Sequence, residues 1–125
     1  EFFLRPLLDD LRYFNFEFNA NRALYLGFGS GMHDLVWLLV EEPAELFAPG
    51  ASRLADGWEI HYRIPAAFIA RFFPGFALTR GQRLRANCYK CGDLTPQPHY
   101  LSWNPMQCDT PAFHRPDDFG LLILG

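Results

Sequence analysis

Residues 13–20 alternate strictly between two kinds of side chain, and this pattern constrains the fold more than any other in the chain. Successive side chains of a β-strand point to opposite faces, so the pattern predicts a strand with an apolar face and a polar face. Asn21 and Arg22 make a plausible turn into the apolar run at residues 23–28, which predicts an antiparallel hairpin. One face carries Phe14, Phe16, Phe18 and Ala20, and the other carries Tyr13, Asn15, Glu17 and Asn19.

Ten glycines and ten prolines divide the rest of the chain into short apolar pieces. Glycines and prolines at this spacing are typical of a chain of short strands joined by turns, and they leave few stretches long enough for a helix. Residues 66–73, after Pro65, are the only segment that we predict as a helix. We predict a surface loop at residues 41–56 and further strands at residues 35–40, 58–64, 84–89, 100–103 and 120–124. These features together predict an all-β fold, an antiparallel β-sandwich with one short helix.

The length of 125 residues is enough for one domain with its own core, so we predict a single domain over residues 1–125. Because Glu1 already lies in a predicted strand, the chain is also compatible with being the C-terminal portion of a longer domain. A net charge of -3 with scattered arginines gives no basic stripe, so we expect no nucleic-acid partner. The longest apolar run, residues 35–40, is far shorter than the roughly 20 residues that span a bilayer, so we expect no membrane insertion.

The chain has three cysteines, Cys88, Cys91 and Cys108, and an odd number excludes complete pairing within one chain. Cys88 and Cys91 lie three positions apart in a predicted strand and therefore point to opposite faces, which disfavours a disulfide between them. With His99 they could form a zinc set, but a single Cys-x-x-Cys within a strand lacks the second pair of a strong zinc site. We therefore expect free thiols and no resident cofactor.

Three blocks in the last third of the chain follow one another at regular spacing: residues 85–93 (RANCYKCGD), 99–105 (HYLSWNP) and 113–120 (FHRPDDFG). These blocks resemble the family-9-like carbohydrate-binding modules. Residues 1–4 (EFFL) and 13–20 resemble early strands of the same family, so the resemblance covers most of the chain. The resemblance begins after the family's N-terminal strands, which supply an aromatic ring in sugar-binding members, so we expect that an N-terminal portion of the domain is missing from this sequence.

The resemblance implies a β-sandwich of the broader dopamine-monooxygenase-like superfamily, used as an accessory domain in secreted or periplasmic bacterial proteins that degrade polysaccharides. Characterised members hold a sugar between aromatic rings and bind its hydroxyls through Glu, Arg, Lys, Asn and Gln side chains. Some also bind structural calcium, but here we expect Asp117 and Asp118 to cap a turn, with calcium as the weaker alternative. We therefore expect an extracellular or periplasmic module with a carbohydrate partner.

A sugar site needs a flat aromatic platform and polar groups fixed on rigid strands. By the resemblance, Trp103 is the platform, with Asn104 beside it; the alternative for Trp103 is packing between the sheets. Arg85 and Asn87 share one side of their strand and could hold adjacent hydroxyls. The alternative for this pair is a solvated polar face or a pairing with Glu17.

Glu17 and Asn19 lie on the polar face of their strand, and Glu1 occupies the opening strand. We predict that these carboxylates and neighbouring arginines form a lattice that contacts the ligand, although charge pairs across exposed strands explain them nearly as well. Lys90 projects to the face opposite Arg85 unless the strand bends, and it is the last of the candidate ligand-binding residues.

The function that we favour is a non-catalytic module that binds a mono- or oligosaccharide with micromolar to millimolar affinity. One alternative is a structural or docking domain whose exposed strand edges pair with a partner chain or an N-terminal segment. A glycosidase using Glu1 with Glu17 or Glu59 is not favoured, because the sequence does not indicate two carboxyl groups in contrasting environments. A haem-binding domain is a further alternative, for which the available ligands are Met32, Met106, His33, His61, His99 and His114.

Overall fold

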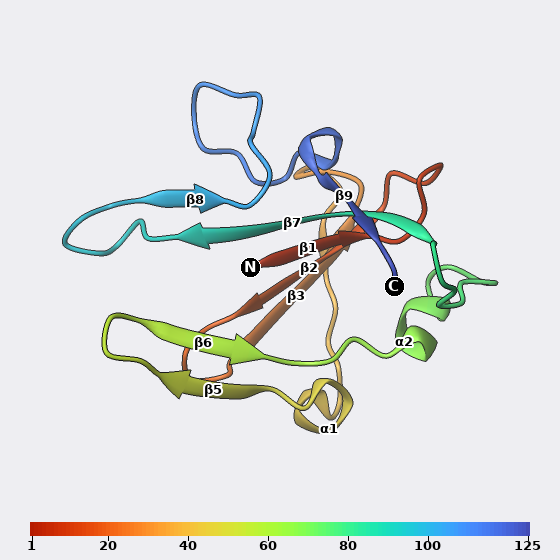
Figure 1. Ribbon diagram of the computed structural model, residues 1–125, viewed down its shortest axis with the longest axis horizontal. Coiled ribbons are helices and arrows are strands. Elements are labelled where there is room, and N and C mark those ends of the chain that lie inside the picture. Colours follow the sequence, from red (N-terminus) through yellow and green to blue (C-terminus); the bar gives the residue numbers. More distant parts are fainter.

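The computed structural model describes residues 1–125 and consists of a large antiparallel sheet and a smaller second layer (Figure 1). The large sheet has the order β4-β3-β2-β1-β7-β8, and β9 also pairs with β7. Its strands are β1 (Phe2–Arg5), β2 (Tyr13–Phe18), β3 (Leu24–Gly29), β4 (Val36–Trp37), β7 (Arg83–Cys91), β8 (Tyr100–Ser102) and β9 (Gly120–Ile123). The second layer contains a hairpin and two short helices: β5 (Gly50–Arg53), β6 (Trp58–His61), α1 (Pro43–Phe47) and α2 (Ala66–Ala70). A single 3-10 turn, η1 (Pro116–Asp118), precedes β9.

Every strand pair is antiparallel, and the all-β prediction is confirmed. The predicted hairpin is also present, since β2 pairs with β3 from Tyr13 opposite Gly29 to Phe18 opposite Leu24. The prediction of a single helix is wrong, because α1 and β5 both lie in the segment that we predicted as a surface loop. Phe47 explains this helix: Pro43 starts it, and the fully buried Phe47 fixes it to the core.

Three other predicted elements are shorter than expected by three residues or more. Helix α2 stops at Ala70, since Phe72 and Phe73 follow in a turn before Pro74. Only Val36–Trp37 of residues 35–40 pairs with β3. Strand β6 ends at His61, because the chain then leaves the hairpin and approaches Pro65 and the start of α2.

The core lies between the large sheet and the second layer and consists mainly of aromatic rings. Phe14, Phe16 and Phe18 project into it from β2, as the alternating pattern predicts. The second layer supplies Phe47 from α1 and Phe68 from α2. Phe14 is central to this packing, with ring centroids 5.0–5.9 Å from those of Phe16, Phe28, Phe68, Phe72 and Phe73.

The opposite face of β2 is polar in sequence but is not exposed along its whole length. Tyr13 and Asn15 are fully buried, because the segment between β8 and β9 folds back over this part of the sheet. Tyr13 stacks on Phe3, and its hydroxyl group lies 2.8 Å from Nδ1 of His114 in that segment. Only the end of β2 that carries Glu17 retains partial exposure. The face of β2 that is polar in sequence is therefore enclosed along the first half of the strand.

Asn87 fixes the covering segment to β7 through both ends of its amide. Its Oδ1 accepts hydrogen bonds from the backbone N–H groups of Asn104, at 2.8 Å, and Cys88, at 3.0 Å. Its Nδ2 donates to the carbonyl oxygen of Asn104 and to the hydroxyl oxygen of Tyr89, both at 3.0 Å. The side chain is fully buried and hydrogen-bonded within the protein, which gives it a structural role.

Phe14→Ala is expected to lower the free energy of unfolding by about 3–5 kcal/mol, because the cavity forms at the centre of the aromatic core. Urea denaturation followed by circular dichroism measures this change. Leu94→Ala is the matched control, since Leu94 is fully exposed, and it should stay within about 0.5 kcal/mol of the wild type. Equal effects of the two substitutions would contradict the assignment of the core.

Asn87→Ala is expected to lower the free energy of unfolding by about 1–3 kcal/mol, since it leaves the partly buried backbone N–H and C=O groups of Asn104 without these partners. The same denaturation experiment measures it, with Asn21→Ala as the control because the Asn21 side chain is exposed. If Asn87→Ala proves as stable as the wild type, the covering segment is held by other contacts.

Candidate functional site

The largest cleft lies at the end of the large sheet, beside the start of β1. There β2 and β7, the two neighbours of β1, extend past Phe2, which pairs with Phe16 on one side and Cys88 on the other. The cleft has a volume of about 1000 Å³. Its lining includes four residues of the large sheet, two residues that flank its strands and two residues of β6: Glu17, Tyr25, Lys90 and Cys91, then Glu1 and Asn19, then Trp58 and Ile60.

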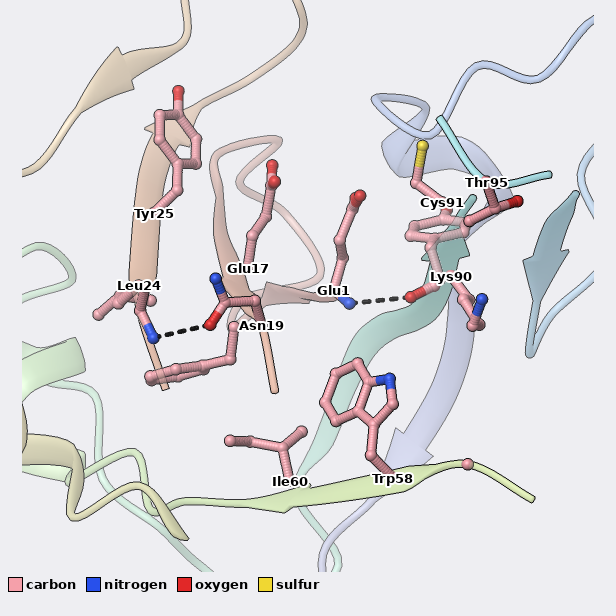
Figure 2. A pocket seen from close by; sticks show the side chains of 14 residues that line it. Glu1, Glu17, Asn19, Leu24, Tyr25, Trp58, Ile60, Lys90, Cys91 and Thr95 are labelled. Atoms are coloured by element: carbon pink, nitrogen blue, oxygen red, sulfur yellow. Dashed lines mark hydrogen bonds between the residues drawn. The ribbon is translucent and has the colours of Figure 1, made fainter. Parts of the chain in front are cut away.

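Glu1 and Glu17 form the acidic wall of this cleft. The pairing of Phe2 with Phe16 places Glu1 beside Glu17, and Glu17 in turn lies opposite Tyr25 on β3. Glu1 is fixed to β7 by two backbone hydrogen bonds with Tyr89, of 2.8 and 2.9 Å. Figure 2 shows the Glu1 and Glu17 side chains next to each other and pointing the same way. Antiparallel pairing therefore brings two carboxyl groups from distant parts of the sequence to one side of the cleft.

Partial burial beside Glu17 raises the pKa of Glu1 to about 7. Partial burial of the carboxyl group is the largest cause, and the negative charges of Glu17 and Asp93 add to it, against the opposing effect of the nearby amino group. Glu17 accepts a 2.8 Å hydrogen bond from Nδ2 of the buried Asn15, which fixes the orientation of its side chain. Near neutral pH the Glu1 carboxyl group is therefore protonated in part of the molecules and can then donate a hydrogen bond as well as accept one.

Trp58 and Ile60 form the apolar wall, on the side of the second layer. They are two positions apart on β6, so they share one face of the hairpin, and both line the cleft. Figure 2 shows them on the core side of the sheet end, whereas the Glu1 and Glu17 side chains point away from them. The Trp58 side chain retains 40% exposure. It therefore presents an aromatic ring that the core does not completely cover.

Four of the eight residues predicted to bind the ligand come together in this cleft. They are Glu1, Glu17, Asn19 and Lys90. Asn19 also has a local role, since its Oδ1 accepts hydrogen bonds from the backbone N–H groups of Asn21, at 2.9 Å, and Ala23, at 3.0 Å. Lys90 is exposed, and its Nζ is hydrogen-bonded to Nε2 of His99.

The other four predicted residues lie outside the cleft lining. Arg85 donates a 2.7 Å hydrogen bond to the carbonyl oxygen of Phe119, and Asn87 is the buried amide described above. Asn104 donates a 2.8 Å hydrogen bond to the carbonyl oxygen of Asp118. Trp103 is 57% exposed and lies on Gly120, where a Cβ atom would come within 2.8 Å of its ring. Trp103 is thus not buried between the sheets, and it is not a wall of the cleft.

Sequence reasoning did not single out Trp58 or Tyr25 as site residues. Trp58 begins an alternating run with Ile60 and therefore reads as an inward-facing strand residue. The sequence feature that could have indicated an exposed ring is the position of Trp58 directly after Gly57, as the first residue of its strand. Core residues are least completely covered at the ends of strands. Tyr25 lies on the same sheet face as Glu17, which the alternation of the hairpin already implied.

The structure brings no group of three or more His, Cys, Asp or Glu side chains together in a way that could hold a metal ion. The three cysteines are free thiols. Asp118 accepts a 2.6 Å hydrogen bond from Nε of Arg115 and a 3.1 Å bond from the backbone N–H of Gln107. The Arg115 guanidinium lowers the pKa of the Asp118 carboxyl group, whose contacts hold the segment before β9 in place. None of the helices is long and apolar enough to cross a membrane.

Two comparisons relate the chain to known proteins. The chain resembles the crystal structure of a protein from Bacteroides uniformis that is provisionally described as carbohydrate-binding, with a TM-score of 0.76 and 30% sequence identity. The alignment covers 99% of this chain and 59% of the other, so this chain spans less than two thirds of that protein. No curated protein matches the chain. The sequence model of carbohydrate-binding family 9 matches residues 1–124, and the chain therefore belongs to this family, whose members are generally non-catalytic binding domains.

Proposed function

We propose that this domain is a non-catalytic module that binds one unit of a mono- or oligosaccharide in the cleft beside β1. The observation that carries the proposal is one cleft at the end of the sheet, lined by the exposed Trp58 on the core side and by Glu1 and Glu17 on the other side. Membership of a carbohydrate-binding family supports it independently.

The two walls suit the two kinds of surface that a pyranose ring offers. Its C–H face is apolar and packs on an aromatic ring, so Trp58 serves as the platform in place of the predicted Trp103. Its hydroxyl groups donate and accept hydrogen bonds, which Glu1, Glu17 and Lys90 can accept or donate at the rim. Because these polar groups come from strands of one hydrogen-bonded sheet, their relative positions are fixed before the ligand arrives.

The arrangement of the carboxyl groups favours binding over hydrolysis. The two carboxyl groups of a glycosidase flank the bond that they cleave, with acid and base or nucleophile on different sides of it. Glu1 and Glu17 lie side by side on one wall and point the same way (Figure 2), so they would both approach a sugar from one side. Glu59 is adjacent to Trp58 on β6 and therefore points away from the cleft face of the hairpin.

Trp58→Ala is expected to weaken glycan binding about tenfold or more, because it removes the platform that covers the apolar face of the sugar. A glycan array followed by calorimetry on the best ligand measures the affinity. Trp103→Ala is the control, since it removes an exposed tryptophan outside the cleft lining, and it should leave the affinity within about twofold.

The opposite result, loss of binding in Trp103→Ala alone, would place the platform at Trp103 and contradict the cleft assignment. Failure of the wild type to bind any glycan would contradict the proposed function and favour the docking domain.

Glu1→Gln is expected to change how stability depends on pH. The pKa of Glu1, about 7, exceeds its ordinary value of 4.5, so the folded protein holds this proton more tightly than the unfolded chain. This stabilisation is complete below pH 4.5 and is lost as the pH rises through about 7. The Tm of the wild type should therefore fall relative to that of Glu1→Gln across this range, as measured by thermal denaturation.

Glu17→Gln supplies the matching test, because it removes the neighbouring charge and should lower the pKa of Glu1. The pH dependence of its Tm should consequently be weaker than that of the wild type. A constant difference in Tm between the wild type and Glu1→Gln would show that folding does not raise the pKa of Glu1.

A further inference from the structure

Two exposed aromatic rings lie beside the cleft and are not part of the core. Tyr25 on β3 and Trp37 on β4 are stacked, with ring centroids 6.1 Å apart and an angle of 21° between the ring planes. Tyr25 is 37% exposed and Trp37 is 63% exposed. Because stacked rings turn one face toward each other, each leaves its outer face and its edges to solvent, and Trp37 at the edge of the large sheet is the more open of the two.

The strand register places these two rings on the same face of the sheet as the acidic wall. Glu17 lies opposite Tyr25, and Gly27 lies opposite Trp37. Tyr25 and Gly27 are two positions apart on β3, so both project to the face that carries Glu17. Trp37, Tyr25, Glu17 and Glu1 therefore follow one another across the sheet, from the edge strand β4 to the cleft.

Tyr25 belongs to both features, since it lines the cleft and stacks on Trp37. Figure 2 shows its ring on the same side as the Glu1 and Glu17 side chains. The outer face of a ring beside a sugar site can accept the apolar face of the next sugar unit, with its hydroxyl groups directed to solvent or to Glu17. This position beside the cleft is the reason to assign a sugar, rather than a protein partner, to the exposed pair.

We propose that Tyr25 and Trp37 form an outer subsite, so that the domain binds an oligosaccharide chain that runs from the cleft toward β4. This inference rests on the proposed function of the cleft. It adds a ligand class, because it requires at least two linked sugar units, and it assigns a binding role to Trp37, which lies outside the cleft lining.

The test compares affinities for a series from the mono- to the tetrasaccharide of the best glycan, measured by calorimetry on the wild type and Trp37→Ala. The wild type should bind the longer members about tenfold more tightly than the monosaccharide. Trp37→Ala should remove this gain and leave the affinity for the monosaccharide unchanged. Trp37→Phe, which keeps an aromatic face, should retain most of the gain.

Val36→Ala is the matched control, because Val36 is the exposed neighbour of Trp37 and lies opposite Phe28, on the other face of the sheet. It should bind every member of the series like the wild type. Circular dichroism checks that Trp37→Ala remains folded.

The outcomes separate the two proposals. Binding that does not strengthen with chain length, or a gain that survives in Trp37→Ala, would overturn the outer subsite while leaving the cleft assignment intact. Loss of monosaccharide binding in Trp37→Ala would make this ring part of the primary site and would also overturn it. Failure of the wild type to bind any glycan would overturn both proposals.

Discussion

Strand β2 carries three phenylalanines on one face, and the burial of these rings is the interaction on which the packing of the two layers depends. β2 is a central strand of the sheet, since β1 pairs with one of its edges and β3 pairs with the other. The helices and the β5–β6 hairpin then cover the phenylalanine face, and Phe47 and Phe68 complete the ring packing.

The site is located where this covering is incomplete. The first half of β2 is enclosed on both faces, by the aromatic core and by the segment that Asn87 attaches to β7. Toward Phe18 the covering segment no longer reaches the sheet, and Glu17 becomes partly exposed. The two carboxyl groups therefore lie where the central strands are only partly covered. This partial burial raises the pKa of Glu1.

The sequence was sufficient to predict what depends on local periodicity. The hairpin of β2 and β3 and the inward direction of Phe14 and Phe16 follow from alternation alone. Features that depend on distant contacts could not be predicted in this way. No residue near Tyr13 in the sequence indicates that the segment around His114 will cover it. The prolines and glycines of residues 41–56 favour a loop, so the short helix that Phe47 anchors could not be predicted from them. Trp58 faces a cleft only because of where the second layer lies above the sheet.

The β5–β6 hairpin is hydrogen-bonded as a sheet only to itself, so the two walls of the cleft belong to separate layers that side-chain packing holds together. The distance between the walls is consequently easier to change than the spacing between the hydrogen-bonded strands of the large sheet. A ligand that touches both walls acts as a cross-link between the layers. Ligand binding should then make the β5–β6 hairpin more rigid, and a more rigid hairpin should bind the ligand more tightly.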